Sequence, residues 1–476
     1  MFSEKLLSLL HTLGKVERNR LRKFLVSPYL NEQPDLVPLF ELCDKALREN
    51  TTEQLSRQFV WQKLYPTKNY QDAQLRRMAS DLTQLTLQFL SAEARSQSPI
   101  TQALDLQRLL EKPELKKHLA GVERNIQQLL EASEGQSTDF YLAQFHLHNN
   151  ISNRATKYLT LVGYAEKLAA ADFNLACFYL TQKLELYTGW LLYQGSRATD
   201  QSVELPDGFW HYLENERFKN VPLLRVYKNV VECLTRPEDE ILFRQLLDEL
   251  DVQAPRLAKK DLRKCYFIAQ NYCALKINQG KREYYREVFE IFKKITQKGV
   301  LLEDGQLSEG IYKNIVTAGL GAGDFEWIEN FIEHYSEFLP LGIRENARTF
   351  NLATLHFYQK KYRRVIELIR DVEYSDVVYA LSAKQMLVRT YYELNEIMAL
   401  DSLIDSFKIF LRRNRELSKN QKREYLNFLN FVKNLTILHP SDARKIDRLK
   451  SKIETTSSLT PKKWLLEKID ELQKKK

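Results

Sequence analysis

The sequence is poor in glycine and proline, with 15 and 13 of these residues in a chain of 476. Average proteins use about 7% glycine and about 5% proline, so both fall short of ordinary usage. Because these residues interrupt helices and form turns, their scarcity favours long helices joined by short loops over a sheet. The sequence also lacks any run of about 18 apolar residues, so it predicts no membrane-spanning helix.

Cysteine is scarce as well, and its pattern argues against two classes of site. The five cysteines are odd in number, widely spaced and without a CxxC pair: Cys43, Cys177, Cys233, Cys265 and Cys273. This argues against a disulfide framework and against CxxC zinc or redox sites. Residues 1–14 also lack the small-residue cleavage site of a signal peptide. We expect free, buried thiols and a cytoplasmic protein.

Common catalytic and nucleotide-binding motifs are missing from the sequence, including HExxH, GxSxG, GxxxxGK[ST] and GxGxxG. Gly319, Gly321 and Gly323 are spaced as GxGxG, but we expect them at a turn between helices, where phosphate binding is not favoured. His146 and His148 are two residues apart, so on a helix they point to different faces and cannot share a metal ion. We therefore predict no enzyme activity, no cofactor and no metal.

Positive charge is concentrated near the C-terminus. The net charge is +9, and residues 408–476 contain 19 Lys and Arg against 8 Asp and Glu, a net of +11, so residues 1–407 carry about −2. This distribution argues against a nucleic-acid binder that is cationic over its whole surface. The basic segment could contact RNA, a membrane surface or an acidic protein, or it could simply face solvent.

What the sequence does contain is a repeated hydrophobic signature. Three sets of five apolar residues share the spacing 3, 3, 1, 3, which places each set on one stripe of an α-helix. The sets are Phe325, Ile328, Phe331, Ile332 and Tyr335; Tyr362, Val365, Leu368, Ile369 and Val372; and Ile397, Leu400, Leu403, Ile404 and Phe407. Their offsets are 37 and 35 residues. Two helices in a period of this length predict an α-solenoid.

Earlier segments continue the repeat. Similar apolar sets occur at 285–295 and 243–250, and the helices expected before each set also keep these offsets. The segments Tyr227-Lys228-Asn229-Val230-Val231 and Tyr312-Lys313-Asn314-Ile315-Val316 are almost identical, two repeats apart. We therefore expect the array to begin near residue 221.

One stretch of the array resembles a tetratricopeptide repeat, in which small and aromatic residues alternate to nest two helices. The resembling residues are Asn351-Leu352-Ala353, Phe357-Tyr358, Tyr362 and Val365-Ile366. Gly323-Asp324-Phe325 occupies the position of the turn between the two helices of such a repeat. The resemblance is clearest over 311–410 and weaker over 221–300. The family's usual small residue at the start of the second helix is replaced by Ile328, Val365 and Leu400, so we expect degenerate repeats.

We predict an all-α protein with four parts. These are a helical module at 1–97, a helical linker or early solenoid at 98–220, an α-α superhelix of tetratricopeptide-like helix pairs at 221–411, and a basic helical cap and tail at 412–476. In the first module we expect helices at 2–13, 16–26, 35–49 and 52–64, and a fifth from residue 72. The segment 159–192 is apolar nearly all round, so we expect it to be the most buried and to break into two helices near Ala169–Asp172.

Cationic and amide side chains occur near the core positions of the first helix in several of the expected helix pairs. They are Lys228, Asn229, Lys313, Asn314, Arg348 and Asn351. The resemblance implies that such asparagines hydrogen-bond the backbone of a bound partner segment on the concave face, while the cations hold an acidic group. Alternatively, the asparagines only satisfy neighbouring polar groups of the helices. We predict a non-catalytic scaffold or adaptor that binds a protein partner.

A second hypothesis is a nucleic-acid-binding regulator. Residues 59–66 and 72–90 resemble the last helices of a winged-helix DNA reader, which bacterial regulators join to a helical-repeat sensor. The candidate nucleic-acid contacts are Arg76, Arg77, Arg412, Arg413 and Arg415. Against this hypothesis, no alternating strand pair follows Phe89, and residues 1–97 hold 14 basic and 11 acidic residues, a net of only +3. The basic residues at 18, 20, 22 and 23 are expected to form a solvated helix face.

Overall fold

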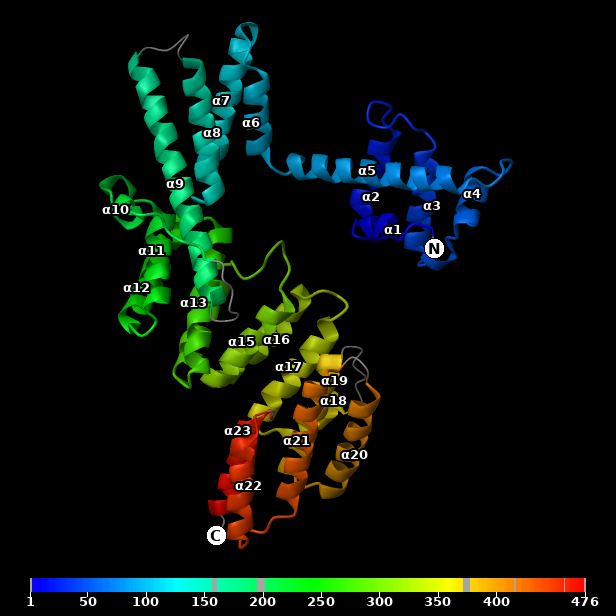
Figure 1. The fold of residues 1–476 in the computed structure, drawn as a ribbon, viewed down its shortest axis with the longest axis vertical. Coiled ribbons are helices and arrows are strands. Elements are labelled where there is room, and N and C mark those ends of the chain that lie inside the picture. Colours follow the sequence, from blue (N-terminus) through cyan, green and yellow to red (C-terminus); the bar gives the residue numbers. More distant parts are fainter. Residues whose placement is uncertain are drawn as a thin grey trace. The chain divides into compact units, whose positions relative to one another are not determined.

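The chain folds into helices alone wherever its structure is described. The computed structural model describes residues 2–155, 161–194, 202–370, 377–414, 417–457 and 459–474, and within these ranges it forms 23 α-helices and no strand (Figure 1). The prediction of an all-α protein is confirmed. The chain divides into two compact units: Met1–Gly189 with Asp200–Arg225 and Arg256–Ala258, and Trp190–Thr199 with Val226–Pro255 and Lys259–Lys476.

The first unit begins with five helices around one apolar core. They are α1 (Glu4–His11), α2 (Lys15–Val26), α3 (Leu36–Arg48), α4 (Arg57–Leu64) and α5 (Asp72–Ser96). Leu10, Leu21, Phe40 and Leu82 are fully buried where these helices meet. One boundary differs from expectation: α4 begins at Arg57 and not at residue 52, because the Ser56 hydroxyl accepts the N–H of Phe59 at 3.2 Å and caps the helix there.

Four longer helices and a short one complete most of the first unit. They are α6 (Pro99–Leu109), α7 (Lys116–Glu131), α8 (Thr138–Ala155), α9 (Leu161–Gln194) and α10 (Phe209–Leu213), followed by the 3-10 turn η3 (Glu216–Phe218). The predicted break at Ala169–Asp172 is wrong, because α9 runs through this segment without interruption. Alanine is the strongest helix former, so the run of alanines continues the helix. One face of α9 is also exposed, so the prediction that it is the most buried segment is wrong.

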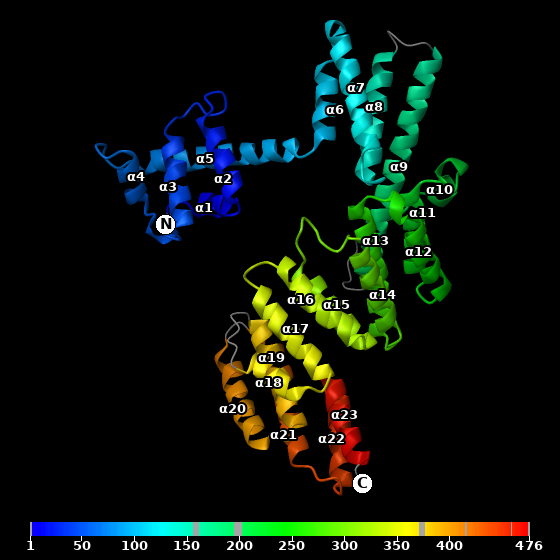
Figure 2. The ribbon, with the colours of Figure 1, turned by 180° about the vertical axis from the view of Figure 1, so that it is seen from behind.

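The second unit is an array of paired helices. They are α11 (Pro222–Thr235), which begins in the first unit, α12 (Glu240–Gln253), α13 (Lys259–Asn278), α14 (Tyr284–Gln297), α15 (Glu309–Ala322), α16 (Phe325–Tyr335), α17 (Arg344–Tyr358), α18 (Tyr362–Ile369), α19 (Val377–Glu393) and α20 (Ile397–Arg413). From α12 to α20 each helix packs on the next, and α17 also contacts both α15 and α19. The first helices of the last three pairs, α15, α17 and α19, therefore lie together in one layer (Figure 2).

The repeated hydrophobic sets supply the buried stripes of the second helices in these pairs, except that Ile397 at the start of α20 is 37% exposed. Ile328, Val365 and Leu400 occupy the same position in α16, α18 and α20, and each is fully buried. The spacing predicted these stripes correctly, because a helix packed on one side repeats its buried positions every three or four residues. Val372, the last member of the second set, lies outside the described residues.

The three glycines near the end of α15 have two different roles. Gly323 lies at the turn with φ of 81°, a left-handed conformation that favours glycine, and Asp324 then caps α16 by accepting the Trp327 N–H at 3.3 Å. Gly319 and Gly321 lie inside α15 and not at the turn, contrary to our expectation. A Cβ added at Gly319 would lie 2.3 Å from the Ile328 side chain, so this glycine permits close packing of α15 against α16.

Three basic helices close the array at its C-terminal end. They are α21 (Lys419–Thr436), α22 (Ala443–Thr455) and α23 (Lys462–Lys474). Phe428, Ile446 and Leu465 are fully buried in a core shared with α17 to α20. The Trp464 indole N–H of α23 donates to Glu393 Oε1 of α19 at 2.8 Å. These helices are thus an integral part of the packed array.

None of the described helices combines the length and the apolar character that a membrane span needs.

Candidate functional site

Two of the predicted partner-binding residues lie exposed on α15. Lys313 and Asn314 face solvent, whereas their neighbours Tyr312 and Ile315 are fully buried. The 3.6-residue period of the helix separates these two faces. The Tyr312 hydroxyl donates to the backbone carbonyl of Ile332 in α16 at 3.1 Å. The segment that presents Lys313 and Asn314 is therefore held in place by the buried side chains of Tyr312 and Ile315 and by this hydrogen bond to α16.

The predicted residues on α17 have partners within the array. Arg348 Nη2 lies 2.7 Å from Glu333 Oε2 of α16, and Arg348 Nη1 lies 3.8 Å from Glu345. The hydrogen bond to Glu333 raises the pKa of Arg348. Asn351 is only 3% exposed, and its amide nitrogen donates to the Ala347 carbonyl at 2.7 Å. The Asn351 amide thus satisfies a polar group of its own helix, which is the alternative role considered for these asparagines.

The first copy of the Lys-Asn pair has a different environment from the second. Lys228 and Asn229 on α11 are half-buried, and each takes part in an interaction within the chain. The nearly identical segments at 227–231 and 312–316 therefore present different surfaces. Lys313 and Asn314 form the best exposed pair among the six predicted residues, and we call these two residues the α15 site.

The arginines proposed for nucleic-acid contact are divided between the two units, with Arg76 and Arg77 in the first and Arg412 and Arg413 in the second. Arg76 on α5 is paired with Asp72 at 2.7 Å, and the Tyr70 hydroxyl donates to the same carboxylate at 2.7 Å. The hydrogen bond from Tyr70 lowers the pKa of Asp72. Arg77 is largely exposed and lies 4.0 Å from Asp81.

The remaining candidate arginines belong to the end of α20. Arg412 and Arg413 are exposed in its last turn, where a cation suits the negative end of the helix dipole. Arg415 lies outside the described residues. Residues 2–97 are fully described and contain no strand, so the hairpin that forms the wing of a winged-helix reader is missing from this part of the chain.

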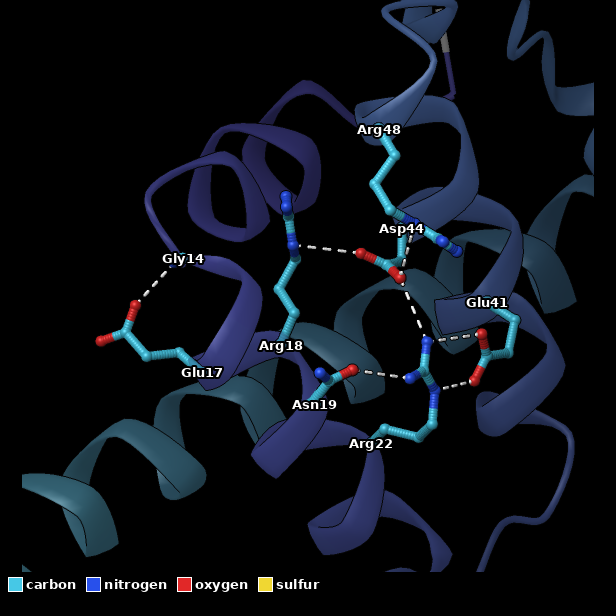
Figure 3. Close-up of polar contacts among 8 residues, drawn as sticks. All are labelled: Gly14, Glu17, Arg18, Asn19, Arg22, Glu41, Asp44 and Arg48. Atoms are coloured by element: carbon cyan, nitrogen blue, oxygen red, sulfur yellow. Dashed lines mark hydrogen bonds and ion pairs between the residues drawn. The ribbon is translucent and has the colours of Figure 1, made fainter.

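A buried carboxylate organises the most extensive polar network of the N-terminal module (Figure 3). Asp44 on α3 has a side chain only 4% exposed, and it is surrounded by three guanidinium groups. Arg18 Nε lies 3.1 Å from it, Arg22 Nη2 donates to it at 3.1 Å, and Arg48 Nε lies 3.3 Å away. Arg22 also forms a bidentate pair with Glu41.

This network corrects the expectation of a solvated basic face on α2. Arg18 and Arg22 point from α2 onto α3, and the hydrogen bond to Glu41 raises the pKa of Arg22. Arg20 is paired with Glu93 of α5 at 2.7 Å, and only Lys23 remains exposed without such a described partner. The arginines at 18 and 22 are one helical turn apart, so both reach the same carboxylate. The network joins α2 to α3.

The cysteines and histidines form no candidate metal centre in the described part of the chain. No group of three or more His, Cys, Asp or Glu side chains gathers there closely enough to hold an ion. All five cysteines are free and buried. Burial raises the pKa of Cys43, of Cys177 and of Cys233 to about 12. Thiols held neutral in this way are poor nucleophiles.

We expect all five thiols to resist a thiol-specific reagent at pH 8 in the native protein and to react once the chain is unfolded. Burial raises the pKa of these thiols in the folded chain, so the unfolded chain loses its thiol protons first, above its pKa of about 8.5. The contribution of the neutral thiols to stability is therefore complete below that pH and is lost as the pH rises above it. The melting temperature should therefore fall from about pH 9 upward. Rapid labelling of any thiol in the native protein at pH 8 would contradict the burial shown here.

Comparison with known proteins found no match: no protein-family model, no curated protein and no solved structure matches the chain.

Proposed function

We propose that this chain is a non-catalytic scaffold whose tetratricopeptide-like helix pairs bind a segment of a protein partner. The observation that carries this proposal is the α15 site, in which an exposed cation and an exposed amide are adjacent on a helix whose opposite face is fully buried. A lysine ammonium can pair with a carboxylate, while an asparagine amide can both donate to and accept from a peptide backbone. The chemistry therefore suits an extended segment that carries an acidic residue.

The arrangement of the array supports the same proposal. The contacts of α17 with both α15 and α19 place the first helices of three pairs in one layer, which offers a continuous surface around the α15 site. A rigid surface of this kind loses little conformational entropy when it binds a ligand. The hydrogen bond from Tyr312 to the Ile332 carbonyl and the Arg348–Glu333 ion pair tie this layer to α16. The side chains of the site thus project from a fixed backbone.

Substitution of the α15 site should abolish partner binding and leave the fold intact. We expect the double variant Lys313→Glu with Asn314→Ala to lose the partner that wild-type protein captures, because the cation is replaced by a charge that repels an acidic segment. Both residues are exposed, so the free energy of unfolding should change by less than about 0.5 kcal/mol. The measurement is quantitative capture from native lysate, with circular dichroism as the check on folding.

Another exposed Lys-Asn pair, outside the predicted site, provides a matched control. Lys419 and Asn420 are also adjacent and exposed, at the start of α21. Lys419→Glu with Asn420→Ala makes the same chemical change and should retain the partner. If the α15 variant captures the same protein as wild type, or if both variants lose it equally, the α15 site is not the binding surface.

A further inference from the structure

The long helix α9 is apolar on two opposite faces, and its neighbours bury one of them. The buried face includes Cys177, Leu180 and Leu184, each fully buried. On the opposite face, Leu168 is 48% exposed, Leu175 43%, Tyr179 45% and Leu186 61%. A helix that is hydrophobic all round is ordinarily buried all round. We call these four exposed residues the α9 stripe.

The α9 stripe is narrow and straight. Its residues are separated by 7, 4 and 7 positions, so at about 100° per residue they fall within about 40° of one another around the helix. They extend along about 27 Å of the axis. Figures 1 and 2 show α8 beside α9 within the first unit, and none of the described residues buries the stripe. Single exposed apolar side chains are ordinary, whereas several aligned on one side of a helix point to an interaction surface.

The spacing of the stripe is the same in both directions along the helix, so a second copy of α9 that runs antiparallel can match it apolar residue to apolar residue. If two copies of α9 pair antiparallel about the level of Cys177, Leu168 meets Leu186 of the second copy and Leu175 meets its Tyr179. Each contact then occurs twice, as in every interface between identical surfaces related by a two-fold axis. Both pairs join apolar side chains of comparable exposure.

The polar residues beside the stripe agree with this register. An antiparallel two-fold pair keeps each side chain on its own edge of the stripe, so pairing about Cys177 brings Asp172 beside Lys183 of the second copy, a carboxylate beside an ammonium group. Parallel pairing would keep Asp172 at the level of the second copy's Asp172 and Lys183 at the level of its Lys183, so it would form no such opposite-charge pair. The Asp172 side chain lies at the edge of the stripe, where it is 63% exposed and pairs with Arg217 at 2.8 Å within the chain.

We propose that the α9 stripe is a homodimer interface, in which two copies of this chain pair antiparallel through α9. This proposal does not depend on the α15 site, because the two surfaces belong to different units. Self-association would bury the second apolar face of α9. It would also give the assembly two copies of the partner-binding array.

Sedimentation velocity of the full chain over a dilution series tests the proposal first. Wild-type protein should show a dimer that dissociates on dilution, and Leu175→Glu should weaken self-association by about a hundredfold or more, because two charges enter each interface. The control is Leu109→Glu on α6, which makes the same change at a leucine that is 71% exposed in the same unit. The control should dimerise as wild type does. A wild-type chain that stays monomeric at every concentration would overturn the proposal.

Cysteine cross-linking tests the orientation and does not depend on how Leu175→Glu folds. The five native cysteines are buried, so introduced surface thiols can be oxidised selectively. Leu168→Cys combined with Leu186→Cys should give a covalent dimer, since the two positions are about 27 Å apart within one helix and can join only between copies. Leu168→Cys alone should stay monomeric on oxidation. Cross-linking of the single variant as efficiently as the double variant would contradict the antiparallel register.

Discussion

Replacement of Asp44 by asparagine should lower the free energy of unfolding of the N-terminal module by about 3–5 kcal/mol, the range seen when one partner of a buried ion pair is removed. The Asp44 side chain is 4% exposed, and that of Arg18 beside it is 17% exposed. Without the carboxylate, the Arg18 guanidinium would remain in the same confined position with no opposite charge within reach. Arg48 is more than half exposed and should contribute little, because solvent screens it.

The control for this prediction is Asp81→Asn on α5. The Asp81 side chain is 30% exposed, lies 4.0 Å from the exposed Arg77, and accepts a hydrogen bond from Gln33 at 3.1 Å that the asparagine oxygen can still accept. Its replacement should change the free energy of unfolding by less than about 0.5 kcal/mol. Urea unfolding of the full chain, followed by probes placed in each unit, measures both variants. Equal effects of the two substitutions would show that Asp44 does not hold α2 against α3.

Alanine at Gly319 should destabilise the helical array by about 1–3 kcal/mol, as overpacking of a core usually does. The added Cβ would lie 2.3 Å from Ile328 Cδ1 and 2.9 Å from the ring of Phe289. Ile328 is itself fully buried, so it has no free space into which it can turn. The higher helix propensity of alanine, worth about 1 kcal/mol, opposes this penalty but does not cancel it.

The same substitution at Gly310 should change the stability of the array in the opposite direction. Gly310 lies in the first turn of the same helix, is exposed, and has no atom within 4 Å of an added Cβ. Gly310→Ala should therefore stabilise the array by up to about 1 kcal/mol, because alanine loses less entropy than glycine when a helix forms. Calorimetry of the two variants measures the difference directly. Stabilisation by Gly319→Ala would mean that α15 and α16 are not closely packed at this point.

The helices of the array were predictable because each carries its own evidence in the sequence. Ile328, Val365 and Leu400 recur at a fixed position, and helical periodicity converts that recurrence into a buried stripe. The turn at Gly323 and Asp324 was predictable for a similar reason, since both residues act on the backbone nearest to them.

Features that depend on neighbouring helices were predicted less well. The charges at Arg18, Arg22 and Asp44 are visible in the sequence, and the four-residue spacings 18–22 and 44–48 show that each pair shares a helix face. That these faces meet follows only from the packing of α2 on α3. For α9, the apolar character of the whole circumference led us to expect complete burial, and it could not show which face the chain itself would bury.

The candidate site also combines features that the local sequence indicates with features that depend on helix packing. Lys313 and Asn314 are exposed, and the repeat identified their buried neighbours Tyr312 and Ile315. Asn351 also precedes a core residue, yet its own side chain is buried against its helix. Two side chains at similar repeat positions can thus have different roles, since the exposure of each depends on how its helix is rotated in the layer.

The measurement that tests the central claim most directly is capture from native lysate by the full wild-type chain and by the α15 double variant, washed at low and at high salt, with protein and nucleic acid both quantified. The scaffold account predicts a specific protein that wild type retains at high salt and the double variant does not. Retention of nucleic acid that falls steeply with salt and is equal for both chains would contradict it, because phosphate contacts release counterions and would favour a nucleic-acid-binding regulator.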